Sequence, residues 1–498
     1  AGATSLNPEF TIRNLARDTV GAMLFSKHGF IPVVDNFKGL ALYLKKGDVY
    51  QRWLKEGGGQ SAMVSLDRNY LAGQLEDILK RPSVVKKAVT NPLSIIQALS
   101  EASEISTRLG EFHNATKGYT GLGNRLFGKQ RVYQSDRLAA LASRDVTLDF
   151  GRSGSKTKNI NKVVAFFNAS IQGTDKLARA FRENPKDMAF KSAMIGLTSY
   201  MLYNLNKNDD RYWELPRWVR DTHWIIPTKD TLVRIPKPFE MGVIFGTGTE
   251  RMLEYFDTGN KKHVSKNAFN GYGGRLVETF TPNLMPTAVL PLIEAGANYS
   301  FFTQRSLVPQ TQEKIPSKYQ YGSNTSSVAR AIGGKLYDIG LGGESLGKYT
   351  NPYAIDNYIR GYTGGLGKLV NDGIDSLTGL SDTRPAKHKS ELPGVRGFTA
   401  TPYASSDSVQ QVYDEFNKQE QLRNAIKLTG EKQEGYDNAQ YNRLKNATDA
   451  FKNVNKRKKA IRDSERLSSE DKRDQLDKLN ITQANIARQA LGLTKIER

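Results

Sequence analysis

The sequence contains no cysteine. Disulfide scaffolds, thiol nucleophiles and cysteine-ligated zinc or iron–sulfur sites are therefore excluded. It also lacks an uninterrupted apolar run of the roughly 18 residues that a membrane-spanning helix requires, because the closest stretch, 188–205, is broken by Lys191 and several hydroxyl residues. The five histidines lie far apart, and none forms a pair with metal-ligand spacing. We therefore expect no bound metal ion and no cofactor.

The sequence does contain a large surplus of positive charge. The 498 residues are 38% hydrophobic and 25% charged, which is a globular composition with enough apolar residues for a core. Lys and Arg number 72 against 51 Asp and Glu, a net charge of +21. This surplus predicts a polyanionic partner, either nucleic acid or an anionic membrane surface. The chain begins Ala-Gly-Ala, without an initiator methionine or a signal-peptide pattern, which indicates a processed chain or a piece of a longer one.

The residue patterns predict a mainly α, elongated protein in four consecutive segments. Residues 1–210 form a helical body, and 211–245 form a Trp- and Pro-rich insert with a small β-hairpin near 222–236. Residues 246–400 are rich in Gly, Ser and Pro, which indicates loops and short helices, and 401–498 form a charged helical tail. No internal repeat is present.

Several local signals predict where helices begin. Asn91-Pro92 and Asn184-Pro185 each mark a helix start, and Ser468 followed by early acids is a plausible cap. The apolar stripe of the tail is too thin to bury itself alone, so we expect the tail to dock on another helix or another subunit. Deleting 405–498 should then reduce assembly and leave the body folded.

Two short motifs are similar to those of enzymes but lack the required context. Residues 123–129 (GNRLFGK) match most of a phosphate-binding loop, yet Gln130 stands where a Ser or Thr must reach magnesium. Residues 343–347 (GESLG) match the nucleophile elbow around Ser345, but no strand leads in and the residues that follow cannot form the required helix. The pair Glu344-Ser345 resembles the sequence around the catalytic acid of lytic transglycosylases, although the rest of that family's pattern is missing. We expect a glycine-rich helix connection and a loop, and no catalytic residue.

A basic segment at 144–182 is the best signal for a binding surface. It holds eight basic and three acidic residues, and part of it is a Gly-Ser loop that enters an amphipathic helix at 160–171. Backbone amides at that helix start would add to the attraction for phosphate. A solvated basic face is the alternative. The residues expected to contact nucleic acid are Arg152, Lys156, Lys158, Lys162, Lys176 and Arg179.

Motifs in a fixed order make the chain similar to a phage family, the large polyvalent protein-associated domain numbered thirty-eight. They are residues 7–18 (NPEFTIRNLARD), 104–109 (EISTRL), 147–154 (TLDFGRSG), 166–173 (FFNASIQG), 234–239 (RIPKPF), 294–309 and 360–365 (RGYTGG). Together they cover roughly residues 7–370, most of the chain, and leave the tail outside. The resemblance transfers no catalytic residue.

The resemblance implies a virion-packaged protein that a short-tailed phage ejects into its host with the DNA. On this basis we expect a non-enzymatic internal virion protein, the C-terminal part of a larger product, that helps to form a DNA-translocating conduit. Its location would be the capsid interior or tail lumen, and the host periplasm or envelope after ejection. Expected partners are other copies of itself, other virion, portal or tail proteins and phage DNA, with the host membrane surface as a further candidate. Two alternatives stay open: the C-terminal domain of a virion-packaged enzyme, either an RNA polymerase or a peptidoglycan lyase, and a sequence-independent DNA-binding structural protein.

Overall fold

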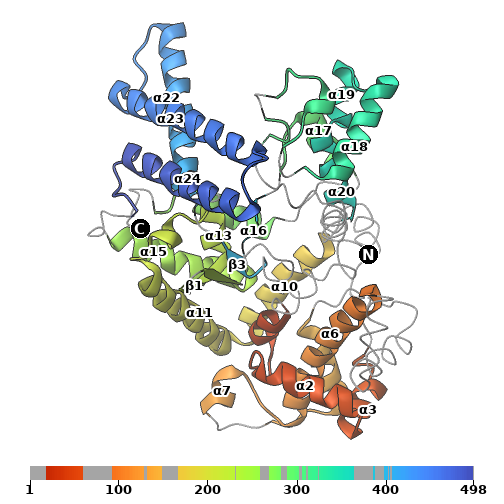
Figure 1. Cartoon of the computed structure of the whole chain (residues 1–498). Helices are drawn as coiled ribbons and strands as arrows, with labels where there is room; N and C mark the ends of the chain where they lie inside the picture. Colours follow the sequence, from red (N-terminus) through yellow and green to blue (C-terminus); the bar gives the residue numbers. More distant parts are fainter. Residues whose placement is uncertain are drawn as a thin grey trace. The chain divides into compact units, whose positions relative to one another are not determined.

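The computed structural model describes most of the chain, and its regular elements are almost entirely helical (Figure 1). The described residues are 18–59, 92–127, 132–147, 167–229, 231–257, 268–281, 289–301, 306–309, 312–322, 325–363, 385–386, 388, 397–401, 403 and 406–496. The prediction of a mainly α protein is confirmed. Within these ranges, no helix combines the length and the apolar character that crossing a membrane requires.

The chain divides into two compact units, each assembled from segments that are not consecutive. Unit 1 comprises Ala1–Met194, Pro238–Glu240 and Leu276–Asp375, and unit 2 comprises Ile195–Lys237, Met241–Arg275 and Ser376–Arg498. The compact units therefore do not coincide with the four consecutive segments expected from the sequence. The hairpin insert and the charged tail belong to the same unit.

The N-terminal part of unit 1 is a cluster of helices around large apolar side chains. Its principal elements are α2 (Val34–Lys45), α3 (Asp48–Lys55), α6 (Pro92–Thr116) and α8 (Asp136–Asp145). Trp53, Leu109 and Phe112 are buried in this cluster, and Trp53 Nε1 donates to Ser143 Oγ at 3.0 Å. Burial of Leu109 and of Phe112 stabilises the fold by about 1.5–3 kcal/mol each.

Helices α2 and α6 pack side by side because glycines stand where they cross. A Cβ atom on Gly39 would lie 1.8 Å from the carbonyl oxygen of Ser106, and one on Gly110 would lie 2.5 Å from that of Asp35. A larger residue at either position would force the backbones apart. Asp35 is itself fully buried and pairs with Arg125 of α7 (Leu122–Phe127), which fixes α7 against this cluster.

The C-terminal part of unit 1 consists of short helices that pack on one another. They are α17 (Leu290–Ala297), η2 (Ser317–Tyr319), α18 (Ser327–Leu336), η3 (Tyr337–Leu341), α19 (Glu344–Thr350) and α20 (Pro352–Thr363). Glu294 of α17 is buried and accepts hydrogen bonds from Asn357 Nδ2 of α20 and from the Phe301 N–H, both at 2.8 Å. The prediction of short helical pieces in this stretch is therefore confirmed.

Unit 2 contains the β-hairpin predicted from the sequence. β1 (His223–Pro227) pairs antiparallel with β2 (Leu232–Pro236), and a third strand, β3 (Thr399–Ala400), pairs antiparallel with β2. Ile225 and Leu232 are buried in the core of this unit. The third strand could not be predicted, because two residues are too few to carry an alternating pattern.

Helices precede and follow the hairpin along the chain. They are α10 (Phe167–Glu183), α11 (Pro185–Asn206), α12 (Asp210–Trp213), α13 (Arg217–Thr222), α14 (Phe239–Met241), the π-helix η1 (Gly242–Thr247), α15 (Gly248–Phe256) and α16 (Tyr272–Phe280). Tyr203 of α11 and Trp213 of α12 pack edge to face, with ring centroids 6.5 Å apart. Both rings belong to the buried core that also holds the hairpin residues Ile225 and Leu232.

The tail folds as a bundle of three helices (Figure 1). They are α22 (Asp407–Thr429), α23 (Asn438–Asp463) and α24 (Ser469–Ala490). Val412, Leu444 and Phe451 are buried between them, and Ala487 of α24 completes the contact. The thin apolar stripe of each helix is therefore covered by the other two helices of the tail, which differs from the expectation that the tail could not bury its own stripe.

The predicted helix starts are confirmed. α6 begins at Pro92 and α11 at Pro185, where the missing proline N–H costs no intrahelical hydrogen bond. Ser468 caps α24, and its hydroxyl oxygen accepts from the Asp471 N–H at 3.0 Å. Glu470 and Asp471 in the first turn also interact favourably with the helix dipole.

Candidate functional site

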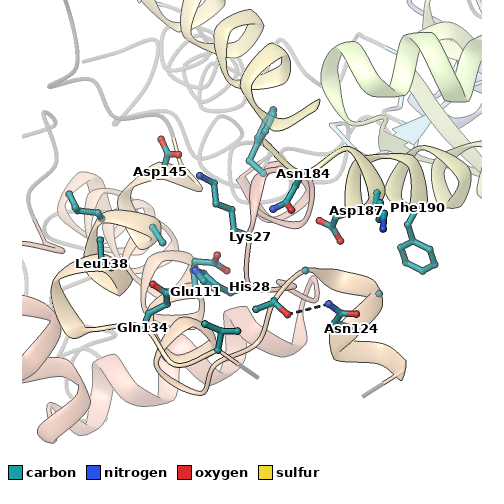
Figure 2. Close-up of a pocket in the computed structure, with 18 of the residues that line it drawn as sticks. Lys27, His28, Glu111, Asn124, Gln134, Leu138, Asp145, Asn184, Asp187 and Phe190 are labelled. Atoms are coloured by element: carbon teal, nitrogen blue, oxygen red, sulfur yellow. Dashed lines mark hydrogen bonds between the residues drawn. The ribbon is translucent and has the colours of Figure 1, made fainter. Parts of the chain in front are cut away.

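A cavity of about 1240 Å³ lies among the described residues of unit 1 (Figure 2). It lies between the segment 25–28 and parts of α6, α7, α8 and α11. Lys27, Glu111, Asp145 and Asp187 supply charged groups to its wall. Other lining residues are Phe25, His28, Asn124, Phe127, Gln134, Leu138, Leu141, Arg144, Asn184, Lys186 and Phe190. Because the wall combines apolar and charged side chains, this cavity is the first candidate site.

Glu111 is the most perturbed acid in this wall. Its side chain is fully buried, and burial raises its pKa to about 8. Ser26 Oγ donates to the carboxyl group, with distances of 2.9 and 2.8 Å to its two oxygens. Burial also lowers the pKa of His28, whose Nδ1 lies 2.7 Å from the carbonyl oxygen of Tyr119. At neutral pH we therefore expect a mostly protonated Glu111 beside an uncharged His28.

The Ser26 hydroxyl is held by hydrogen bonds within the protein. Its hydroxyl oxygen accepts the N–H groups of His28 and Phe30, each at 3.0 Å, while its proton is directed at Glu111. A hydroxyl has one proton and two lone pairs, so its hydrogen-bonding capacity is fully used by the fold. The Ser26 side chain therefore links the segment that begins at residue 26 to Glu111 of α6.

Lys191 and Asp187 form the second polar element behind the cavity. Lys191 Nζ lies 2.7 Å from Asp187 Oδ2 and donates to the carbonyl oxygens of Leu24 and Ser26, each at 2.9 Å. Asp187 also accepts the Leu122 N–H at 2.9 Å, so it ties α7 to α11. These contacts position α7, α11 and the segment 24–26 relative to one another.

Unit 2 contains a different site, a buried network of ion pairs beside the hairpin. Arg251 pairs with Asp221 and donates to Glu254 at 2.8 and 2.9 Å. Arg220 reaches Glu254 at 3.3 Å and also Asp407 at 3.3 Å. Single buried charges are costly, whereas alternating partners at these distances offset the cost of desolvation.

The network extends to the π-helix through Lys237. Its Nζ lies 2.6 Å from Glu250 Oε2 and donates to Thr247 Oγ1 at 3.1 Å. Burial lowers the pKa of Lys237 and raises that of Glu250. Thr247, the last residue of η1, in turn donates to the carbonyl oxygen of Asp221 at 2.5 Å. The π-helical turn thus places Thr247 where the hairpin and α15 meet.

A second branch of the network joins the tail to α12. Glu214 is fully buried and accepts from Ser406 Oγ at 2.5 Å, Ser408 Oγ at 2.7 Å and Arg488 Nη1 at 3.0 Å. Arg488 also lies 3.3 Å from Asp210. The residues are far apart in the sequence, and no local pattern could have predicted that they meet.

Comparison with known proteins identifies the segment that contains most of this network. Residues 209–395 match the family model described as large polyvalent protein associated domain 38. These residues are similar to that domain. Neither the curated proteins nor the solved structures gave a match. The matched range begins later than the 7–370 expected from the motifs and extends further, so the motifs before residue 209 lie outside it.

Domain 38 as matched contains the hairpin, η1 and the helices α12 to α20. Arg220, Arg251 and Glu254 of the buried network lie inside it, whereas Asp407 and Arg488 lie beyond its end. The last three helices are therefore attached to domain 38 by ion pairs that cross the boundary of the match.

The predicted nucleic-acid contacts lie partly outside the described residues. Arg152, Lys156, Lys158 and Lys162 fall within 148–166, which the structure does not describe. Lys176 is buried, and its Nζ donates to the carbonyl oxygens of Asp145 and Thr147. Arg179 lies 3.0 Å from Asp175 and 3.8 Å from Asp145. The fold therefore encloses the ammonium group of Lys176, whereas the contacts with nucleic acid stay a prediction.

Both enzyme-like motifs lie partly in helices. Residues 123–127 of the phosphate-loop-like motif lie in α7, while Gly128 and Lys129 lie outside the described residues. Ser345 is exposed on α19, which follows the helical turn η3, so no strand precedes it. The expectation of a loop at this motif was wrong: residues 344–350 form a helix. Within the described ranges, no group of three or more His, Asp or Glu side chains is arranged to hold a metal ion.

Proposed function

We propose that this chain is a non-enzymatic bacteriophage internal virion protein that is ejected with the genome and helps to form a conduit for DNA. The observation that carries the proposal is the match of residues 209–395 to domain 38, a domain of large polyvalent proteins. The chain would be stored in the capsid or tail lumen and act in the host envelope after ejection. Its partners would be other copies of itself, other virion, portal or tail proteins, and the phage DNA.

The distribution of charge supports contact with a polyanion. Among the described residues that are buried, nine are acidic and nine are basic. The acidic ones are Asp35, Glu111, Glu214, Asp221, Glu240, Glu250, Glu254, Glu294 and Asp407, and the basic ones are Arg108, Lys176, Lys191, Arg220, Lys237, Arg251, Lys458, Lys472 and Arg488. This buried set is balanced, so it accounts for none of the net charge of +21. The surplus is left for residues that can attract phosphate.

A conduit must let any sequence pass, so the DNA contact would be electrostatic and independent of sequence. Contacts to base edges specify a sequence and would slow the movement of other sequences. Spaced cations that contact phosphates position the duplex without reading it. A non-enzymatic role also agrees with the cavity of unit 1, where Ser26 and Lys191 are fully engaged by the fold.

The proposal is tested on particles of a phage that encodes this chain. Proteins of purified particles are identified by mass spectrometry before and after genome release is triggered. We expect the chain in full particles and its depletion from emptied ones, relative to a capsid protein that stays behind as the control. A chain missing from full particles contradicts packaging, and one retained in emptied particles contradicts ejection.

A further inference from the structure

The positive charge of the tail is concentrated on one of its three helices. α23 contains eight Lys and Arg residues and two acidic residues, Asp449 and Asp463. α22 contains three basic and four acidic residues, and α24 contains four of each. Residues 405–498 together hold 19 basic and 15 acidic residues, a net charge of only +4, so the sum conceals one strongly basic helix. This segregation needs an explanation that a uniformly solvated surface does not provide.

Four exposed lysines of α23 lie in one row. Lys445, Lys452, Lys456 and Lys459 are separated by seven, four and three residues, and all four are exposed. At 3.6 residues per turn these spacings place them within about 60° of arc, and at 1.5 Å per residue they span about 21 Å. The row is therefore a nearly straight line of cations along the helix.

The buried face of α23 fixes the direction of this row. Leu444, Phe451 and Val454 are buried in the bundle core, so the helix cannot rotate about its axis. Within the basic run 456–459, one side chain is buried in the bundle and the other three are exposed to solvent. Lys458 is buried and donates to Gln483 Oε1, and burial lowers its pKa to about 8, whereas its neighbours are exposed.

The residues beside the lysine row favour DNA over a membrane as the partner. Asn442, Asn446 and Asn453 are exposed and form a second row next to the lysines. A helix that lies on a membrane presents large apolar side chains next to its cations. In α23, Leu444, Phe451 and Val454 are instead buried in the bundle, and Ile461 is half-buried. Lysine and asparagine side chains are both common donors to phosphate oxygens.

We propose that the exposed lysine row of α23 binds the phosphate backbone of double-stranded DNA without reading its sequence. This inference rests on the proposed function and assigns its DNA contact to a surface outside domain 38. Asp449 lies within the same face and is 2.6 Å from Lys452 Nζ. Its carboxylate therefore opposes phosphate binding locally, and its removal should strengthen the interaction.

The experiment compares two variants of the full chain that lose the same number of charges. In the first, Lys445, Lys452, Lys456 and Lys459 are all changed to Gln. In the matched control, Lys418, Lys427, Lys432 and Lys478, which are exposed lysines of the same bundle region, are changed to Gln. Binding to a short duplex of arbitrary sequence and to a second, unrelated duplex is measured over a salt series. Circular dichroism melting shows that both variants stay folded.

The wild type should bind both duplexes alike, and its affinity should fall steeply with salt. The α23 variant should lose up to about 0.9 units of the log–log salt slope for each phosphate contact removed, while the control keeps a slope close to that of the wild type. Asp449→Asn should bind more tightly than the wild type.

Three results would overturn the inference. If the wild type binds and the α23 variant behaves like the control, the surface is wrong but the proposed function is unaffected. If the wild type binds neither duplex, the DNA contact in the proposed function fails as well. Binding to vesicles that contain phosphatidylserine, but not to duplex DNA, would assign the row to a membrane surface.

Discussion

Glu111 shows how one buried side chain couples the stability of unit 1 to pH. Burial raises the pKa of its carboxyl group from 4.5 to about 8, and Ser26 is its hydrogen-bond donor. A raised pKa means that the folded state holds the proton more tightly than the unfolded state. This contribution to stability is complete below about pH 4.5 and is lost as pH rises to about 8.

We predict that Glu111→Gln removes this dependence. Glutamine preserves the shape and a hydrogen-bonding oxygen but cannot ionise, so the variant should gain stability relative to the wild type as pH rises. The gain should be at most about 1.4 kcal/mol per pH unit between about pH 5 and about pH 8. Denaturant unfolding at several pH values measures it. Glu465→Gln, at an exposed position, is the control, and a difference that stays constant with pH would contradict the prediction.

At the scale of elements, the attachment of α24 to α12 depends on a few buried polar atoms. Arg488 is almost completely buried and lies 3.0 Å from Glu214 Oε1, and its Nε donates to the carbonyl oxygen of Thr494 at 2.6 Å. Ser406 and Ser408 approach the same carboxylate from the start of α22. Two helices of the bundle therefore converge on one acid of unit 2.

We predict that Arg488→Met destabilises unit 2 by about 3–5 kcal/mol, because removing one partner leaves the other charge buried and uncompensated. Urea unfolding followed by far-ultraviolet circular dichroism measures the change. Arg457→Met is the matched control, since Arg457 is an exposed arginine of the same bundle and should change stability by less than about 0.5 kcal/mol. Equal effects of the two substitutions would show that the buried pair contributes little.

At the scale of the whole molecule, unit 2 is assembled from the hairpin region and from the tail. Arg220 of α13 is buried, and its guanidinium group lies 3.3 Å from the carboxylate of Asp407. Asp407 is the first residue of α22. The tail therefore completes the ion-pair network of a region that precedes it by almost two hundred residues. The sequence alone predicts that the body stays folded after deletion of 405–498. With these ion pairs, we expect the part of unit 2 that contacts the tail to lose stability instead.

We predict that deleting residues 405–498 exposes the region around α12 and α13, because Glu214 and Arg220 lose their buried partners. Hydrogen–deuterium exchange measures the effect: peptides that cover 210–222 should lose most of their protection. Peptides from α6 in unit 1 provide the internal control and should keep theirs. Unchanged protection at 210–222 would mean that the tail merely rests on a region that is stable by itself.

Local chemistry in the sequence determined where several elements of this protein begin and turn. Pro92 and Pro185 start helices because they need no N–H donor there, Ser468 caps a helix, and two β-favouring runs around a turn form the hairpin. These signals act over a few residues and are therefore visible in the sequence. The motifs at 234–239, 294–309 and 360–365 lie within the range that matches domain 38, whereas the earlier motifs do not.

Tertiary structure alone decided which charges are buried and which are exposed. Lys176 belongs to a basic segment, yet backbone carbonyls enclose its ammonium group. In the run 456–459, helical rotation turns Lys458 inward and Lys456 and Lys459 outward. Glu214 and Arg488 meet across 274 residues. The amino-acid composition does not distinguish buried charges from exposed ones. Burial and pairing depend on contacts between residues that are distant in the chain.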